Sequence, residues 1–246
     1  MLVIKPFIYN QFTDITFGFS TKIAPDVNPP YYFNLSFSVG DKKENVEHNR
    51  KLFFSSLGLN EFTVSYQRQV HDDFIREVKN TGNCGESDAL ITNTKNLGLA
   101  ISSADCPAIF IYDSGKKVIA AVHSGWRGTE KKIVKKTINK LKNEFNSDPS
   151  DLIIYLGPSI SQNSYEVGED VAQKFDEEFI LKKENKFYLN LSAANFKMVI
   201  EEGVKRTNIQ VSKLCSYEYK NLLHSYRRDG QISGRALGVI AMKESQ

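Results

Sequence analysis

Short runs of apolar residues recur along the chain and predict a series of β-strands. Several of these runs, such as "VIAAV", are apolar at every position, which is typical of strands buried on both faces. We expect strands near residues 14–19, 63–70, 97–102, 108–112, 118–122, 152–156 and 236–242. The pattern therefore predicts layers of structure on both sides of these strands.

Other segments place apolar residues three and four positions apart, which is the spacing of an amphipathic helix. The clearest is 130–145, whose apolar face holds Ile133, Val134, Ile138, Leu141 and Phe145. We also expect helices at 42–57, with Asp41 as the N-cap, at 169–179, and at 191–206 after Asn190. Strand and helix segments mingle without strict alternation, which favours an α+β fold over a doubly wound nucleotide-binding fold.

The composition is that of an ordinary soluble globular protein, because 41% of the 246 residues are apolar and 25% are charged. We find no linker-like stretch and no internal repeat, so we expect one domain spanning residues 1–246. The longest apolar runs are far too short to cross a bilayer. The N-terminus lacks the features of a secretory signal. We therefore expect a cytoplasmic protein with no membrane partner.

The charge pattern argues against a nucleic-acid partner. The formal net charge is +3, and the lysines of the predicted helix 130–145 are spread around it rather than gathered in a stripe. The chain lacks both GxGxxG and GxxxxGK[ST], the phosphate-binding patterns of dinucleotide and P-loop folds. Its cysteines, Cys84, Cys106 and Cys215, lie far apart and form no CxxC pair. We therefore expect neither a disulfide framework nor a structural zinc ribbon.

Three potential metal ligands lie at the ends of predicted strands. His71 and His123 each follow an apolar run directly, and Cys106 lies in the turn between two further runs. If these strand ends meet at one sheet edge, they bring together two imidazoles and one thiolate. That donor set suits zinc and leaves a fourth position for water or substrate. The spacing alone also fits two histidines in turns and a buried, inert cysteine.

Polar residues near these ligands have candidate roles of their own. Asp105 is placed to orient a ligand histidine through its second ring nitrogen. In "GWRGT", Thr129 is a candidate cap for a helix from Glu130, and the free N–H groups there would form an anion site with Arg127. Glu166, shortly before the predicted helix 169–179, is a candidate general acid or base.

Each of these residues also fits a structural role, in a turn, in an ion pair or at a helix start. A polar turn near the C-terminus adds Arg227, Arg228 and Arg235. These side chains either close the pocket over the ligands or tie the terminus to carboxylates. Residue types alone leave both interpretations open.

Short motifs are spread over nearly the whole chain. They are "GFST" (18–21), "FNLSFSVGD" (33–41), "HNRKLF" (48–53), "QVH" (69–71), "SDALIT" (87–92), "ADCP" (104–107), "HSGWRGT" (123–129), "LGPSI" (156–160), "YEVG" (165–168), and "SYRRDG" with "GR" (225–235). In this order they resemble the YfiH-type laccase-domain family, whose members are also described as purine nucleoside phosphorylases and peptidoglycan-editing factors. The combination is far more specific than any single motif.

The resemblance implies a layered α/β/β/α sandwich of mixed β-sheets, and it maps the family's metal ligands onto His71, Cys106 and His123. It also implies cytoplasmic zinc enzymes that cleave purine nucleosides with phosphate and deaminate adenosine. We therefore expect zinc, with copper as the alternative metal, in a monomer or homodimer. The expected partners are phosphate and a purine nucleoside: adenosine, inosine or methylthioadenosine.

The site expected from the resemblance and from the residues together has two further groups. The catalytic candidates are Asp105, Arg127 and Glu166, and the substrate-binding candidates are Asn34, Arg50, Gln69, Gly125 and Trp126. Arg127, with the neighbouring helix N-terminus and Arg50, is the expected phosphate seat.

The chain departs from the family pattern at three places. Asp72 follows the histidine of "QVH" where a glycine is usual, Cys106 and Pro107 abut without the residue that commonly separates them, and Ser124 replaces a frequent alanine. These departures bear on the rim of the pocket and on substrate preference more than on the metal.

Three other functions fit part of the sequence. A multicopper phenol oxidase needs a histidine-rich copper cluster, and four histidines are too few for it. A metal-free cysteine hydrolase would use a Cys106–His123 pair. The third alternative is a role in editing peptidoglycan precursors or in binding a partner, which the residues do not separate from nucleoside cleavage.

Overall fold

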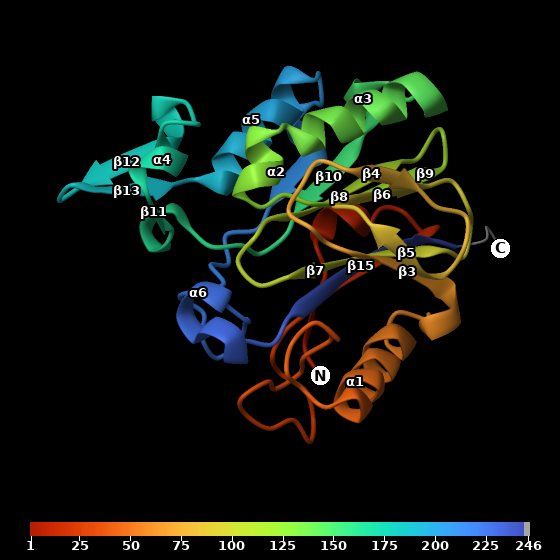
Figure 1. Ribbon diagram of the computed structural model, residues 1–246. Helices are drawn as coiled ribbons and strands as arrows, with labels where there is room; N and C mark the ends of the chain where they lie inside the picture. The colour runs from red at the N-terminus through yellow and green to blue at the C-terminus, as the bar shows by residue number, and fades with distance from the viewer. Residues whose placement is uncertain (244–246) are drawn as a thin grey trace.

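The computed structural model describes residues 1–243, in which two six-stranded sheets pack against each other (Figure 1). The strand order in the first sheet is β1 (Val3–Ile4), β2 (Ile15–Ser20), β15 (Ala236–Met242), β7 (Gly98–Ser103), β3 (Val64–Arg68) and β5 (Gly82–Glu86). The pairs of β3 with β7 and with β5 are parallel, and the others are antiparallel. Strands from the two ends of the chain, β2 and β15, therefore lie side by side.

The second sheet carries most of the fully apolar strands. Its order is β14 (Ile209–Val211), β10 (Ile153–Leu156), β8 (Ala108–Asp113), β9 (Val118–His123), β6 (Ala89–Thr92) and β4 (Ile75–Glu77). The outer pairs β10–β14 and β4–β6 are parallel, and the central pairs are antiparallel. Both sheets are therefore mixed, as predicted.

Helices cover the outer face of each sheet (Figure 1). α1 (Lys43–Ser55) packs Phe53 and Phe54 against the first sheet. α3 (Ile133–Phe145) and α5 (Leu191–Glu201) cover the second sheet, and the apolar face predicted for 130–145 is the buried face of α3. The order of layers is helix, sheet, sheet, helix, so the predicted α/β/β/α architecture is confirmed. The remaining helices are short: α2 (Trp126–Glu130), α4 (Glu169–Ala172) and α6 (Tyr226–Asp229).

Aromatic rings fill the space between the two sheets. Phe17 of β2 meets Phe110 of β8 edge to face, with ring centroids 4.8 Å apart. A Cβ on Gly238 of β15 would overlap Cζ of Phe110, so only glycine lets the ring approach the backbone this closely. The sheets are thereby held together by interlocked large side chains.

A small third sheet projects beside the second one (Figure 1). It consists of β11 (Glu166–Val167), β13 (Lys186–Leu189) and β12 (Ile180–Lys183). With α4 it encloses a separate apolar cluster that includes Phe179 and Leu189. Trp126 and Tyr165 pack against the same cluster, which connects this sheet to the segment after His123.

All the predicted strands are present within two residues of their expected ends. The strands that the pattern did not predict are β1, β4, β5, β6 and β11–β14, each two to five residues long. β5 has the sequence "GNCGE", which carries no apolar alternation at all. Such strands are fixed by pairing with neighbours rather than by their own side chains.

Helix limits differ more from the prediction. The helix expected at 130–145 begins at Ile133, because Lys132 has a φ of 61° and interrupts it. The helix expected at 169–179 ends at Ala172, and the one expected at 191–206 ends at Glu201. Asn190 is confirmed as an N-cap, since its side chain accepts a hydrogen bond from the Ala193 N–H.

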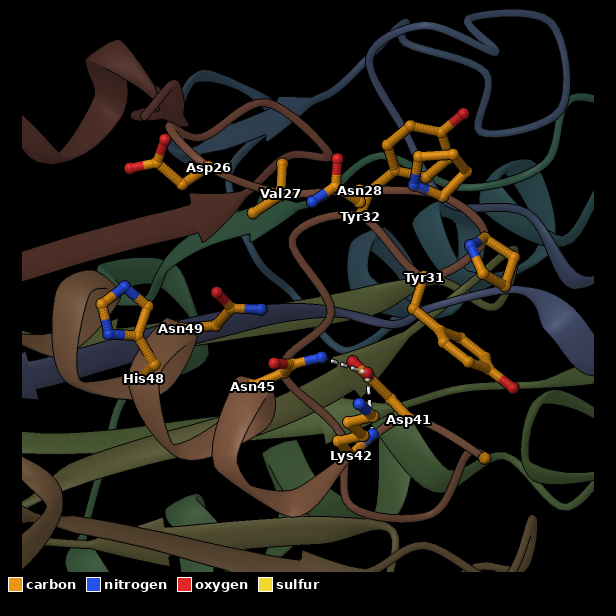
Figure 2. Close-up of a pocket in the computed structure, with 13 residues that line it drawn as sticks. Asp26, Val27, Asn28, Tyr31, Tyr32, Asp41, Lys42, Asn45, His48 and Asn49 are labelled. Carbon is orange, nitrogen blue, oxygen red and sulfur yellow. Dashed lines mark hydrogen bonds between the residues drawn. The ribbon is translucent and has the colours of Figure 1, made fainter.

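Asp41 is not the N-cap of α1, because the helix begins one residue later than predicted, with Lys42 in that position. Its carboxylate instead accepts hydrogen bonds from the Lys42 N–H and the Asn45 side chain (Figure 2). Within residues 1–243, no helix combines the length and the apolar character needed to cross a membrane.

Candidate metal centre

Three turns at strand ends bring His71, Cys106 and His123 together. His123 is the last residue of β9 and pairs with Ala108, two residues beyond Cys106. The potential ligand atoms of the three residues all lie within 4.8 Å of one another. His123 is 3% exposed, Cys106 is half-buried and His71 is exposed, so the cluster opens to solvent at His71. The predicted convergence of these residues is confirmed, and the cluster could hold a metal ion.

Gly125 keeps the space beside the cluster free. A Cβ at this position would lie 3.1 Å from Sγ of Cys106 and 3.2 Å from Cδ2 of His71. A side chain there would therefore press on two of the candidate ligands. Gly125 was predicted to contact substrate, and the structure places it directly against the cluster.

A buried carboxylate, Asp88, fixes both histidines. Nδ1 of His123 lies 2.8 Å from Oδ1 of Asp88. The backbone N–H groups of Val70, His71 and Asp72 also donate to this carboxylate at 2.9–3.1 Å. The φ of 59° at His71 curls the turn so that three successive amides point at one anion. Asp88 thus leaves Nε2 of His123 as the ring nitrogen available to a metal.

The sequence prediction omitted Asp88, although it lies in the motif "SDALIT". Asp88 directly precedes β6, whose four residues are all buried. A carboxylate that directly precedes a fully buried strand needs hydrogen-bond donors. This need was the signal in the sequence that could have identified Asp88. Which donors it would find depends on turns distant in sequence, so its role was not predictable.

The charges in the cluster reinforce one another. Burial alone would raise the pKa of the Cys106 thiol, but the neighbouring His123 and His71 bring it down to about 6. Burial alone would lower the pKa of His123, but Cys106 and Asp88 raise it to about 9. The thiolate form of Cys106 is therefore favoured at neutral pH, which is the form that binds metal.

Asp105 does not orient a ligand histidine, contrary to the prediction. Its buried carboxylate accepts a hydrogen bond of 2.6 Å from the Ser216 hydroxyl and one of 2.7 Å from the Arg227 N–H. Asp105 has a φ of 88°, an uncommon conformation for a residue with a side chain. These bonds anchor the C-terminal segment to the turn that carries Cys106.

Two of the predicted substrate-binding residues, Asn34 and Gln69, form hydrogen bonds with the backbone. Asn34 is fully buried, and its side chain bonds to Ser36, Asp41 and the Arg235 N–H, and the substrate contact expected for it stays a prediction. Gln69 exchanges two hydrogen bonds of 2.8 Å with the backbone of Ser102. Its side-chain amide therefore connects the segment between β3 and His71 to strand β7.

Arg50, the other arginine of the expected phosphate seat, is enclosed by aromatic rings. Its guanidinium carbon lies 4.4 Å from the Phe37 ring centroid and 4.7 Å from that of Tyr66. Its Nε donates to the Leu35 carbonyl at 2.8 Å. Burial lowers the pKa of Arg50.

The segment "GWRGT" differs from its predicted form. α2 begins at Trp126, and Thr129 lies inside it, donating to the Gly125 carbonyl rather than capping a later helix. With five residues, α2 is too short to supply the predicted anion site at its N-terminus. Arg127 is exposed, with its guanidinium carbon 4.3 Å from the Trp126 ring centroid.

Glu166 belongs to β11 and not to the turn before a helix. Its carboxylate accepts a hydrogen bond of 2.9 Å from Nζ of Lys186 on β13, and the pair is exposed. Its backbone carbonyl accepts from Nη1 of Arg227 at 2.7 Å. A catalytic role for Glu166 stays a prediction.

A cavity of about 370 Å³ lies apart from the cluster, between the loop 26–32 and the start of α1 (Figure 2). Tyr31, Asp41 and His48 are among its lining residues, and none of the three candidate metal ligands is. The candidate chemistry and this cavity are therefore in different places. Asp41, which lines the cavity, accepts a hydrogen bond from Asn34, and Asn34 in turn accepts one from the Arg235 N–H.

A sequence profile of the family described as multi-copper polyphenol oxidoreductase laccase matches residues 16–243. The chain belongs to this laccase family. The resemblance predicted from the motifs is thereby confirmed.

Several proteins named purine nucleoside phosphorylase are similar to this chain over most of its length. A purine nucleoside phosphorylase of Clostridium acetobutylicum is 36% identical over 216 residues, covering 85% of this chain and 87% of the relative. The purine nucleoside phosphorylase YlmD of Bacillus subtilis is 29% identical, covering 94% and 90%.

The fold is shared with solved structures of the family. YfiH of Bacillus licheniformis, described as a hypothetical protein, has a TM-score of 0.90 at 28% identity, covering 96% of this chain and 94% of that one. YlmD of Geobacillus stearothermophilus has a TM-score of 0.90 at 26% identity, covering 95% and 93%. These likenesses agree with the layered mixed-sheet architecture described above.

The family's description mentions several coppers, but the donors in this chain are few. His48 is exposed on α1, and His224 is buried against the Phe33 carbonyl. Among residues 1–243, the one group of three or more potential ligands is His71, Cys106 and His123. One thiolate and two imidazoles suit a single borderline ion better than a multicopper cluster.

Asp72, one of the departures from the family pattern, has a defined place. Its N–H donates to Asp88, and its carboxylate pairs with Lys131, just after α2. The hydrogen bond from the Lys131 side chain and that from the Asp73 backbone N–H lower the pKa of Asp72 to about 2. This pair connects the turn of His71 to the start of α3.

Proposed function

We propose that the protein is a zinc-dependent purine nucleoside phosphorylase that acts on adenosine and inosine and deaminates adenosine as a side activity. The observation that carries this proposal is the His71, Cys106 and His123 cluster, open to solvent on one side. It occurs in a chain that is 36% identical to a curated purine nucleoside phosphorylase. We propose that methylthioadenosine is a further substrate of the same site.

In phosphorolysis, an oxygen of phosphate forms a bond to C1′ of the ribose while the bond from C1′ to N9 of the purine breaks. The electron pair of that bond leaves with the purine, which takes up a proton, and the sugar becomes ribose 1-phosphate. In deamination, water replaces the amino group of adenine and ammonia leaves. Both reactions gain from a positive centre that stabilises developing negative charge.

Zinc held by His71, Cys106 and His123 would supply a Lewis acid for a purine or a water molecule. The residues around it fit such an ion, because Gly125 leaves room for it and Cys106 favours the thiolate. Asp88 would keep His123 in the tautomer that presents Nε2. Catalytic roles for Asp105 and Arg127 are part of this proposal.

The test begins with untagged protein whose metal content is quantified before and after dialysis against a chelator. Adenosine is then supplied with and without phosphate to the wild type and to a Cys106→Ala variant. We expect near-stoichiometric zinc, phosphate-dependent release of adenine and slower formation of inosine. The variant should lose the metal and both activities.

A second thiol provides the matched control. Cys84 is half-buried and donates to the Tyr66 carbonyl, away from the candidate ligands. A Cys84→Ala variant should keep both zinc and turnover. If the wild type binds zinc but leaves every purine nucleoside intact, the proposed activity is wrong. If it is metal-free yet cleaves nucleosides, the zinc requirement is wrong.

A further inference from the structure

We propose that Arg235, with Arg227 at the rim, binds the inorganic phosphate used in the reaction. This inference rests on the proposed function, since it assigns the second substrate of the same site. It replaces the phosphate seat predicted from the sequence, because α2 is too short to bind an anion at its N-terminus and Arg50 is enclosed between two rings.

The backbone of Arg235 is firmly placed. Its N–H donates to Oδ1 of the buried Asn34 at 3.0 Å, and its carbonyl accepts from the Leu35 N–H at 3.1 Å. Nη1 of the guanidinium donates to the Ser233 and Gly234 carbonyls. The guanidinium carbon lies 5.2 Å from the Tyr226 ring centroid. These contacts orient the guanidinium and leave Nη2 and Nε for a ligand.

The charge of Arg235 has no direct counter-ion. Within residues 1–243, the arginines that form ion pairs are Arg68 and Arg228. Burial lowers the pKa of Arg235, while Asp105, Tyr226 and Cys106 act in the opposite direction. The Asp105 oxygens already accept from Ser216 and from the Arg227 N–H. A half-buried cation without a bonded carboxylate is a favourable site for an anionic ligand.

Arg227 brings a second guanidinium to the same region. Its N–H donates to Asp105, next to Cys106, and its Nη1 donates to the Glu166 carbonyl. The guanidinium carbon lies 5.1 Å from the Tyr165 ring centroid. Burial is the main cause of the raised pKa of Tyr165, and the nearby Cys106 and Asp105 raise it further. Arg227 and Arg127 lower this pKa. Arg227 is thereby tied to the turn of Cys106, and Arg235 directly precedes Ala236, which pairs with Ser103, whose hydroxyl donates to the Cys106 carbonyl.

Phosphate matches this arrangement chemically. It carries negative charge at neutral pH and several acceptor oxygens, and a guanidinium presents paired N–H donors that fit them. A phosphate beside the cluster would have an oxygen near the ribose of a nucleoside whose purine faces the metal. Arg235 and Arg227 would then neutralise the attacking group and hold it in place.

The experiment varies phosphate and adenosine independently in steady-state assays of the zinc-loaded protein. Arg235→Gln should raise KM for phosphate roughly 10- to 100-fold, which is the loss expected for one charge-assisted interaction. KM for adenosine should stay within about threefold of wild type. Arg235→Lys should restore part of the phosphate affinity, because it keeps the charge but not the paired donors.

Arg206→Gln is the matched control, because Arg206 is exposed beside Phe196 on another part of the surface. It removes the same charge and should leave both KM values unchanged. Arg227→Gln should raise KM for phosphate less than Arg235→Gln does, since Arg227 is more exposed. An Arg235→Gln variant with unaltered KM for phosphate would overturn the assignment.

A binding measurement separates this inference from the proposed function. Inorganic phosphate should raise the thermal midpoint of zinc-loaded wild type, and Arg235→Gln should abolish that shift. If wild type cleaves no nucleoside but still shows the Arg235-dependent shift, the function fails and the phosphate site stands. If wild type is active and the phosphate-induced shift persists in Arg235→Gln, the phosphate site is wrong while the proposed function stands. A shift with adenosine monophosphate but none with phosphate also overturns the assignment.

Discussion

The carboxylate of Asp88 lies 2.8 Å from Nδ1 of His123 and accepts the backbone N–H of His71 at 3.0 Å. One buried anion thus controls the ring of one candidate ligand and the backbone of the other. Backbone amides and His123 hold the pKa of Asp88 below its usual value although burial opposes them, so the carboxylate is charged. The ring of His123 and the backbone of His71 are therefore held in place before any metal binds.

Asp88→Asn should weaken zinc binding about 10- to 100-fold, the usual effect of removing the carboxylate partner of a ligand histidine. The amide keeps the size of the side chain but not its charge, and its NH₂ group cannot accept the amides of the turn. Competition with a zinc chelator measures the change. Asp113→Asn is the control, because Asp113 is equally buried but caps the turn after β8 through Gly115 and Lys116. Equal zinc affinity in the Asp88 variant and wild type would contradict the orienting role.

Gly125→Ala should remove the metal while leaving the fold intact. The new Cβ would lie 3.1 Å from Sγ of Cys106 and 3.2 Å from Cδ2 of His71, so at least one ligand must move. We expect at least a tenfold loss of zinc affinity, or about 1.4 kcal/mol. Zinc content and the far-ultraviolet circular dichroism spectrum are measured together. Gly115→Ala, where the new Cβ meets Asp113 at an ordinary 3.4 Å, should bind zinc like wild type.

The strands and the three metal ligands were predictable because local pattern determines them. The five residues of β9 that precede His123, "VIAAV", are all apolar, and the whole strand is buried. Ligand type and position at strand ends then sufficed to select His71, Cys106 and His123. The short strand β5 was not predictable, since its pairing with β3 and not its composition makes it a strand.

The groups that support the ligands were predicted poorly, because their partners lie far away in the sequence. Asp105 looked like the partner of a ligand histidine, being adjacent to Cys106, yet it bonds to Ser216 and Arg227. Asp88 has that role from a position 35 residues before His123. Sequence proximity favours Asp105 as the partner of a ligand histidine. The pairing of β6 with β9 instead places Asp88 beside His123.

His224 should make the protein less stable as the pH falls below neutrality. Burial, together with Lys22 and Arg235, lowers its pKa from 6.5 to about 3, although a hydrogen bond to Phe33 opposes this. Between those values the unfolded chain binds a proton that the folded protein excludes. The free energy of unfolding should therefore drop as the pH falls below 6.5, with a slope that approaches about 1.4 kcal/mol per pH unit.

Urea unfolding at several pH values measures this slope. His224→Gln removes the titrating group, so its stability should depend less on pH between about 6 and 4 than that of wild type. The variant is expected to be less stable at pH 7, because Gly234 packs directly against the ring. His48→Gln, on the exposed face of α1, should keep the wild-type slope. An unchanged slope in the His224 variant would assign the acid sensitivity to other groups.

Asn195→Ala should destabilise the junction between α5 and the segment that follows His123. The Asn195 side chain is fully buried, accepts from the Ser124 hydroxyl at 2.7 Å and donates to Thr129 at 3.0 Å. Without the Asn195 amide, the hydroxyls of Ser124 and Thr129 have only each other as side-chain hydrogen-bond partners, 3.0 Å apart. We expect the free energy of unfolding to fall by roughly 2 kcal/mol. This net value includes a gain of about 0.5 kcal/mol from the higher helix propensity of alanine.

Urea unfolding of Asn195→Ala at pH 7 tests this, with Asn208→Ala as the comparison. Asn208 is half-buried and donates a single hydrogen bond of 3.0 Å to the Ser150 carbonyl, so its loss should cost about 1 kcal/mol or less. Because Ser124 directly follows His123, the Asn195 variant should also bind zinc more weakly, whereas the Asn208 variant should not. Equal stability losses in the two variants would show that the Ser124–Thr129–Asn195 network adds nothing beyond an ordinary surface hydrogen bond.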